Sequence, residues 1–157
     1  MNIRDLHTPE DEAAALAFIM GSQRFEHALE PDRRLDPAVA REHFAALTQK
    51  VATNQGRMFI AEEDGRAVGW VVFLVERKPV FVVEDERTHG YITELFVEDG
   101  ARGLGVGRAL IEACEDEARR LGLSQIMIGL LTKNARAAEI YARAGYGPYA
   151  SELRKYL

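Results

Sequence analysis

The spacing of apolar residues along the chain changes several times between a period of two and a period of three to four. The longer period is typical of helices that bury one face, whereas dense or alternating apolar runs are typical of strands. The helical spacing predicts helices over residues 8–21, 36–53, 106–121 and 135–144. The other pattern predicts strands over residues 2–6, 57–62, 67–75, 91–97 and 125–131, and one strand or a very short hairpin within residues 146–157.

Local signals indicate where several of these elements begin and end. Thr8 is the expected N-cap of the first helix, and Pro9 suits its first turn. Asn134 is expected to cap the last helix, and Gly145 to end it. Asp64-Gly65 is typical of a tight hairpin turn between two strands.

The order of the elements predicts an α/β (α+β) fold with a mixed sheet. Residues 91–131 run from strand through glycine-rich loop and helix to strand, which predicts one parallel crossover. The hairpin-linked strands before it are expected to pair antiparallel, and the apolar strand 125–131 is expected to be buried on both faces. Residues 22–35 are expected to form a loop or a broken helix. Residues 76–88 are expected to extend the neighbouring strands or to form an excursion towards the substrate.

Composition narrows the class of protein. The chain has 157 residues, 47% of them hydrophobic and 29% charged, as expected for one globular domain over residues 1–157. A net charge of −5 argues against nucleic acid or an acidic membrane as the main partner. The longest apolar run, Ala67 to Val75, is too short to span a bilayer, and no leader pattern opens the sequence, so a cytoplasmic protein is expected. The lone Cys114 lies on the apolar face of its helix and is expected to be structural.

The stretch from Arg102 to Arg108, Arg-Gly-Leu-Gly-Val-Gly-Arg, carries the strongest chemical signal. Alternate glycines weaken strands and helix interiors, so packing does not explain them. They suit a turn that presents backbone N–H groups beside a helix N-terminus, which is a site for phosphate. The spacing differs from the dinucleotide-binding fingerprint, and no Gly-Lys-Ser or Gly-Lys-Thr of a nucleotide triphosphate loop is present.

A second motif lies downstream, in which Asn134 is followed at the right distances by Tyr141, Gly145 and Tyr146. Together with Arg-x-x-Gly-x-Gly, it makes the chain resemble the GNAT-type N-acetyltransferase superfamily. The resemblance covers the whole chain in element order and is motif-specific from about Tyr91 to Tyr146. It implies a mostly antiparallel central sheet with one splayed parallel strand pair and flanking helices.

The resemblance also implies acetyl-CoA as co-substrate, with no metal ion. The backbone of Leu95, Phe96 and Val97 would pair with the pantetheine arm, and the backbone amides of the loop would hold the pyrophosphate. The expected cofactor-binding residues of this loop and its flanks are Arg102, Gly103, Leu104, Gly105, Val106, Gly107, Arg108, Asn134, Ala137 and Tyr141. Arg102 could instead shape the loop, and Asn134 could act only as a helix cap.

Tyr141 is the expected general acid. A thiol titrates near ~8.5 and a tyrosine near ~10, so Tyr141 would be protonated at neutral pH and able to donate to the leaving sulfur. The alternative is an aromatic residue of the core. Asn134 and Tyr141 are two helical turns apart and share a face with Ala137, which leaves room for a ligand.

Glu94 is the expected catalytic carboxylate because it interrupts an apolar strand beside the splay. It could remove the proton of the amine directly or through water, anchor the substrate ammonium, or serve the structure alone; His89 and Tyr91 are the reserve candidates. Two departures from relatives weaken its assignment as base. Gly129 occupies the position where some relatives place a base, and Thr93-Glu94 replaces the two successive carboxylates of diamine-type relatives.

The function expected from the resemblance is direct transfer of acetyl to the primary amine of a small molecule. The alternatives are an acetyltransferase for protein N-termini or lysines and a non-catalytic acyl-CoA-binding module. Specificity in the family implies roles for residues 24–27, for Arg33-Arg34 and for Phe81, which do not reveal the substrate. The short tail after Gly145 raises the hypothesis of a homodimer in which a partner chain completes the sheet.

Overall fold

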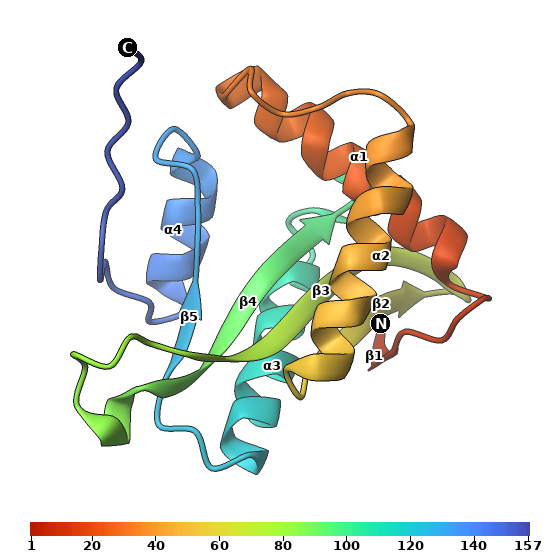
Figure 1. The fold of residues 1–157 in the computed structure, drawn as a ribbon. Helices are drawn as coiled ribbons and strands as arrows, with labels where there is room; N and C mark the ends of the chain where they lie inside the picture. The colour runs from red at the N-terminus through yellow and green to blue at the C-terminus, as the bar shows by residue number, and fades with distance from the viewer.

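The protein folds around one sheet with helices on both faces, in a computed structural model that describes all residues from 1 to 157 (Figure 1). The strands lie in the order β1 (Asn2–Asp5), β2 (Arg57–Glu63), β3 (Arg66–Arg77), β4 (Thr88–Val97) and β5 (Ile126–Ile128). Strands β1 to β4 pair antiparallel, whereas β4 and β5 are parallel. The mixed, mostly antiparallel sheet predicted from the sequence is therefore confirmed.

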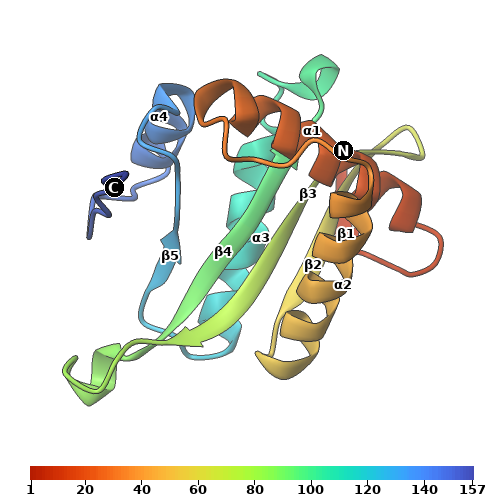
Figure 2. The same cartoon turned by 45° about the horizontal axis from the view of Figure 1, so that its top comes forward.

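The helices divide between the two faces (Figure 2). One face carries α1 (Glu12–Leu29) and α2 (Ala38–Thr53), the other carries α3 (Val106–Arg120), and α4 (Ala135–Arg143) stands beside β5 and the C-terminal segment. Two short 3-10 helices, Glu84–Glu86 and Asp99–Ala101, lie before and after β4.

Strand β3 is the centre of both cores. Because side chains of a strand alternate between its faces, Val71 and Phe73 pack in the cluster under α3. Trp70, Val72 and Leu74 pack in the cluster under α1 and α2. All five side chains have no exposed surface, and burying one such apolar side chain contributes about 1.5–3 kcal/mol. The strands that carry the site are thus fixed on a rigid layer.

One extra residue in β4 opens the sheet at the site. Val72 pairs with Glu94 and Phe73 pairs with Ile92, so Thr93 has no partner on β3 and forms a β-bulge. A bulge bends the strand and increases its twist. The pairing of β4 with β5 ends at Ile92, immediately before the bulge, and Figure 1 shows the two strands diverging beyond it. This is the splayed parallel pair expected from the sequence.

The start of the first helix differs from the prediction. The helix begins at Glu12, so Thr8 is not its N-cap and Pro9 is not its first residue. The Asp11 carboxylate accepts hydrogen bonds from the Arg4 guanidinium at 2.6 and 2.9 Å and from the backbone N–H of His7 at 2.8 Å. These contacts tie residues 8–11 to β1 as turns and delay the first helical turn.

The end of that helix also lies further along the chain than predicted. Helix α1 continues to Leu29, so the loop or broken helix expected over residues 22–35 is confined to its second half. Gly21, which marked the predicted end, lies inside the helix, and a Cβ there would overlap the Phe96 ring. The glycine is present for the close approach of α1 to β4. Residues 22–26 are consequently presented on a helix.

The C-terminal part carries less sheet than predicted. Strand β5 has three residues, which are half-buried, so the prediction of a long strand buried on both faces is wrong. Residues 146–157 contain no strand, so the expected terminal strand or hairpin is also absent. With no strand beyond it, β5 is the edge of the sheet and is covered only in part. The homodimer remains a prediction.

Residues at both ends of the segment 76–88 extend the neighbouring strands, which was one of the two alternatives expected from the sequence. Strand β3 runs to Arg77 and β4 starts at Thr88. The connecting residues Val80, Phe81 and Val83 are exposed.

The lone cysteine, Cys114, is fully buried in the core under α3, which agrees with the structural role expected for it.

Candidate active site

A cavity of about 730 Å³ lies where β4 and β5 diverge. Strand β4 and the start of α3 form one wall, β5 and α4 form the opposite wall, and α1 and α2 close the third side. It is lined by most of the residues singled out from the sequence: Glu94, Leu95, Phe96, Val97, Arg102, Gly103, Gly105, Val106, Gly107, Arg108, Asn134, Ala137 and Tyr141. Of the predicted catalytic and cofactor-binding residues, only Leu104 does not line it, and its side chain is exposed.

The glycine-rich loop owes its shape to two left-handed residues. Gly103 has φ +80° and Gly105 has φ +85°, a region that L side chains rarely adopt. Gly107 lies in the first turn of α3, where a Cβ would meet only the Val97 side chain at 3.8 Å. Val106 between them is buried and anchors the helix start in the core. The backbone conformation therefore defines the loop, and no side chain of Gly103 or Gly105 covers its surface.

The backbone N–H groups of this loop are free to bind a ligand. From Gly103 to Arg108, none donates a hydrogen bond to a carbonyl; the first bonded amide is that of Ala109, which donates to Gly105 at 3.0 Å. The start of a helix also carries a partial positive charge from the aligned peptide dipoles. A run of unpaired N–H groups at this place fits a pyrophosphate. The fit needs no side chain, which agrees with the exposure of Leu104.

The side chain of Arg102 is held by the protein. Its Nε donates to the Val97 carbonyl at 2.9 Å, and the guanidinium pairs with Asp99 and lies over the rings of Phe25 and Phe96. Arg102 thereby fixes the exit of β4 relative to the loop. Of the two roles expected for it, shaping the loop has a contact in the structure, and binding of a phosphate remains a prediction.

The start of α4 presents the second motif to the cavity. The Asn134 side-chain oxygen accepts a hydrogen bond from the Ala137 N–H at 3.1 Å, so the predicted helix cap is present. The side-chain NH2 group of Asn134 makes no hydrogen bond with the protein, which leaves a donor for a ligand. Ala137 and Tyr141 follow on the same face, and all three line the cavity.

Tyr141, on α4, lines the cavity with a hydroxyl that is free to bind a ligand. It makes no hydrogen bond with the protein, and its ring lies 6.3 Å from the ring of Tyr146. Burial, followed by the negative charge of Glu26, raises the pKa of Tyr141 to about 12. Tyr141 therefore keeps its proton throughout the neutral range and can donate it. A purely structural aromatic role would not require the free hydroxyl.

Glu94 has a partner that the sequence did not reveal. Its Oε1 lies 2.6 Å from Nε2 of His43, which comes from α2, and both residues line the cavity. Since Glu94 pairs across the sheet with Val72, it projects from the face that α2 covers. The hydrogen bond that His43 Nε2 donates to the Glu94 carboxylate raises the pKa of His43. A histidine at apolar helical spacing is typical of packing, so only its distance from Glu94 identifies it.

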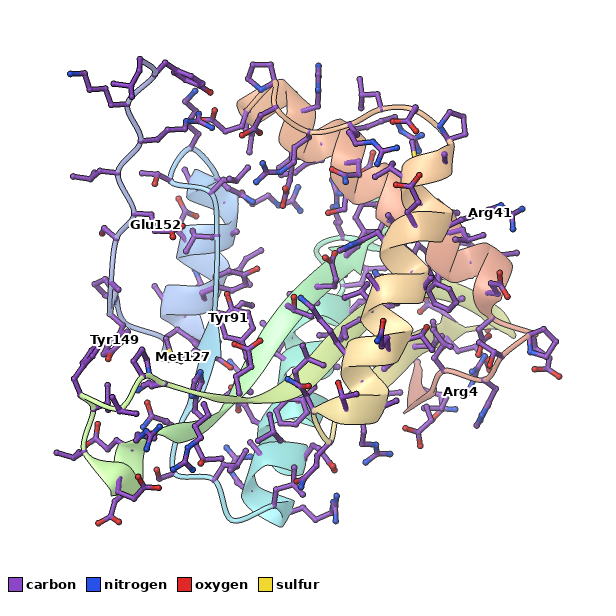
Figure 3. The ribbon with its side chains drawn as sticks, viewed as in Figure 1. Arg4, Arg41, Tyr91, Met127, Tyr149 and Glu152 are labelled. Carbon is purple, nitrogen blue, oxygen red and sulfur yellow. The ribbon has the colours of Figure 1, made fainter.

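Acidic side chains from α1, β4 and the C-terminal segment line the cavity. Glu26 pairs with Arg33 at 2.7 Å, and the two line the cavity with Phe25, Glu94 and Glu152, the last from the C-terminal segment beside α4 (Figure 3). Of the other residues expected to determine specificity, Arg24, His27, Arg34 and Phe81 do not line it.

An ion-pair cluster joins the C-terminal segment to the end of α1. Arg154 contacts Glu30 and Asp32 at 2.7 Å each, and Lys133 contacts Glu30 at 3.0 Å. Glu30 is thus shared between the connection that precedes α4 and the C-terminal segment. The cluster holds Glu152 at the cavity.

The two reserve candidates differ in position. Tyr91 lies between β4 and β5 (Figure 3), and a Cβ at Gly129 would stand 2.8 Å from its hydroxyl. Tyr91 therefore fills the place where some relatives carry a base on the later strand. His89 is buried, contacts the Arg87 carbonyl at 3.0 Å and does not line the cavity.

The structure contains no cluster of acidic, histidine and cysteine side chains arranged to hold a metal ion. None of its helices has the length and apolarity needed to cross a bilayer.

Comparisons with known proteins find acetyltransferases among the relatives of this chain. The IAA acetyltransferase of Azospirillum brasilense is 29% identical over 110 residues, which cover 66% of this chain and 67% of that protein. The D-amino-acid N-acetyltransferase HPA3 of Saccharomyces cerevisiae is 29% identical over 138 residues, which cover 88% of this chain and 80% of that protein. For the mycothiol acetyltransferases among its relatives, the chain matches less than half of the relative's length.

The fold is shared with solved structures. A tetramutant of the BH1408 protein from Bacillus halodurans superposes with a TM-score of 0.82 over the full length of both chains, at 19% identity. The sequence of residues 10–146 matches the family model of the Acetyltransferase (GNAT) family. The match spans the glycine-rich loop, Glu94 and Tyr141, and the chain therefore belongs to the GNAT acetyltransferase family.

Proposed function

We propose that the protein transfers the acetyl group of acetyl-CoA directly to a primary amine of a small molecule. The observation that carries the proposal is that one cavity joins the unpaired N–H groups of residues 103–108 to the free hydroxyl of Tyr141. The first feature fits the pyrophosphate of coenzyme A. The second fits protonation of the thiolate that leaves when acetyl is transferred.

The residues fit coenzyme A along its length. The β4 backbone from Thr93 to Val97 has no β5 partner, so Leu95, Phe96 and Val97 can pair with the amides of the pantetheine arm. The unpaired side-chain NH2 group of Asn134 lies at the start of α4 and lines the same cavity. Bound acetyl-CoA supplies a thioester as the acyl donor. The protein supplies the cradle, the alignment and the proton transfers.

Tyr141 acts as general acid in this proposal. A thiol of pKa about 8.5 leaves as a thiolate, and a phenol with a higher pKa keeps its proton until it is donated. The raised pKa of Tyr141, about 12, ensures that the hydroxyl is protonated at any working pH. Its place on α4 puts this proton opposite the strand that holds the pantetheine arm.

The acidic end of the cavity suits an amine as the acceptor. An alkylammonium ion of pKa about 10.4 is attracted by Glu94 and Glu26 and must lose a proton before it can attack the thioester. Glu94 would anchor this group and assist removal of its proton. Side chains from α1, α2 and the C-terminal segment line this space and would contact the acceptor. The name of the yeast relative, a D-amino-acid N-acetyltransferase, supports the same class.

Release of free CoA thiol, measured with acetyl-CoA over a panel of small amines and peptides, tests the proposal. We expect turnover with at least one small amine and an N-acetylated product. Turnover confined to peptides would favour an acetyltransferase for protein N-termini or lysines. Tight binding of acetyl-CoA without turnover on any acceptor would contradict the proposal and favour a non-catalytic acyl-CoA-binding module.

A further inference from the structure

The contact between His43 and Glu94 joins two elements that are far apart in the sequence. His43 comes from α2 and Glu94 from the bulged end of β4, yet Nε2 and Oε1 lie 2.6 Å apart. The Glu94 side chain is 17% exposed and that of His43 is 37% exposed. The Glu94 side chain is therefore more deeply buried than that of His43.

The other ring nitrogen of His43 is uncommitted. Nδ1 makes no hydrogen bond with any group of the protein, and His43 lines the cavity. When Glu94 is ionised, Nε2 carries the hydrogen that it donates to Oε1, so in the neutral ring Nδ1 bears the lone pair. A carboxylate that fixes the tautomer of a histidine in this way leaves the opposite nitrogen as a proton acceptor.

Acidity favours the imidazole over the carboxylate as proton acceptor. An ordinary glutamate, with a pKa of about 4.3, is some six units more acidic than an alkylammonium ion of pKa about 10.4, whereas histidine starts near 6.5. A base works best when its pKa lies near the working pH. The charged groups that face His43 are Glu94 from β4, Glu26 from α1 and Lys50 on its own helix. Hydrogen bonding to Glu94 outweighs burial and raises the pKa of His43 further towards the working range.

We propose that His43 is the general base of the transfer and that Glu94 positions it. The inference rests on the proposed function. The nitrogen of the amine forms a bond with the acetyl carbon, and the bond from that carbon to sulfur breaks. The proton lost by the nitrogen passes to Nδ1 of His43, directly or through one water molecule, and Tyr141 gives its own proton to the sulfur. His43 becomes an imidazolium ion beside ionised Glu94 and returns its proton to solvent, and the Tyr141 phenolate takes up a proton from solvent.

The pH dependence of kcat/KM distinguishes His43 from Glu94 as the base. With an alkylamine acceptor, the amine introduces no bend in log kcat/KM between pH 5.5 and about 9, because its own pKa is near 10.4. A base is active only when unprotonated, so the wild type should show one bend, above about pH 6.5, with slower turnover on its acid side. Glu94→Gln removes the charge that raises the pKa of His43. In that variant we expect the bend at a lower pH.

His43→Gln keeps a hydrogen-bond donor near Glu94 but cannot titrate. We expect kcat to fall by about 10² or more and the bend to disappear. The matched control is His7→Gln, since His7 is exposed and does not line the cavity. This control should keep the wild-type rate and bend. An unchanged affinity for acetyl-CoA shows that each variant is folded.

One measurement needs no catalytic variant. The ring signals of His43 in the wild-type protein, followed by NMR against pH, should titrate above pH 6.5 and at the pH of the kinetic bend. The inference is overturned if the two values differ, if His43→Gln keeps the wild-type rate and bend, or if Glu94→Gln abolishes a bend that His43→Gln retains. Failure of the proposed function would look different, since the wild type would then transfer acetyl to no amine.

Discussion

The two halves of the cavity are built in opposite ways. The half that fits coenzyme A consists mainly of neighbouring residues, from Leu95 at the end of β4 to Arg108 in the first turn of α3, which offer backbone groups; Asn134 on α4 adds one side chain. The half that faces the acceptor consists of side chains from distant elements. His43 and Glu94 are 51 positions apart, and the ion pair that fastens the C-terminal segment joins Arg154 to Glu30 across 124 positions.

This difference shows how one fold can keep a donor and change an acceptor. Backbone N–H groups bind a phosphate whatever the surrounding side chains are, provided that the turn keeps its left-handed residues. A side-chain site can change with single substitutions on α1 or α2 while the sheet below stays the same. Substitutions in the two halves should therefore affect different measurable quantities.

The largest effect is expected at the junction of the two halves. Tyr141→Phe removes the hydroxyl and keeps the ring, so kcat should fall by about 10²–10⁴ while the Kd for acetyl-CoA stays within about twofold. Steady-state kinetics and calorimetry measure the two quantities. Tyr156→Phe is the matched control, because Tyr156 is exposed and does not line the cavity. An unaltered kcat in Tyr141→Phe would remove the general acid from the account.

The next effect belongs to the donor half alone. Gly105→Val places a β-branched residue at φ +85°, a strain of about 1–3 kcal/mol that the loop can relieve only by moving its N–H groups. The Kd for CoA should rise by about 10- to 100-fold. Gly100→Ala is the control, since a Cβ there meets nothing within 4 Å and its φ is not left-handed. Equal affinities in the two variants would show that the loop does not hold the cofactor.

The smallest effect belongs to the acceptor half. Glu26→Gln removes a carboxylate from the cavity and one of the two acidic partners of the Arg33 guanidinium, which keeps its contact with Asp32 at 2.7 Å. The KM for a cationic amine should rise about two- to tenfold, in line with the modest energies of part-exposed charges, and the rise should shrink at high salt. The Kd for CoA should not change. Glu139→Gln, on the exposed side of α4, is the control. A larger change in the Kd for CoA than in the KM for the amine would contradict the assignment of Glu26 to the acceptor half.

The same difference explains what the sequence could predict. The residues of the donor half that line the cavity could be named one by one from the sequence, because a run of glycines after a strand and an asparagine cap are local signals; their binding of the cofactor stays a prediction. The mixed sheet followed from element order for the same reason. The acceptor half depends on contacts that only the fold creates. His43 has no local signal, and its partner became evident only when the bulge at Thr93 and the packing of α2 placed Glu94 beside it.

The wrong element boundaries have physical causes of the same kind. Gly21 resembled a helix end, but it allows α1 to approach Phe96, and α1 therefore continues past it to carry Glu26 to the cavity. The apolar residues of β5 resembled a doubly buried strand, but the sheet ends there. Long-range packing sets both element boundaries, and the local spacing of apolar residues carries no information about that packing.

The most direct test of the divided cavity is an NMR titration of the backbone amides with CoA. The account predicts the largest shifts at Gly103 to Arg108, because their N–H groups change from unpaired to phosphate-bound, and small shifts along α2 around His43. Gly105→Val should lose these shifts at the same CoA concentration, and His43→Gln should keep them. Shifts centred on α2, or unaffected by Gly105→Val, would contradict the assignment of the donor half to the glycine-rich loop.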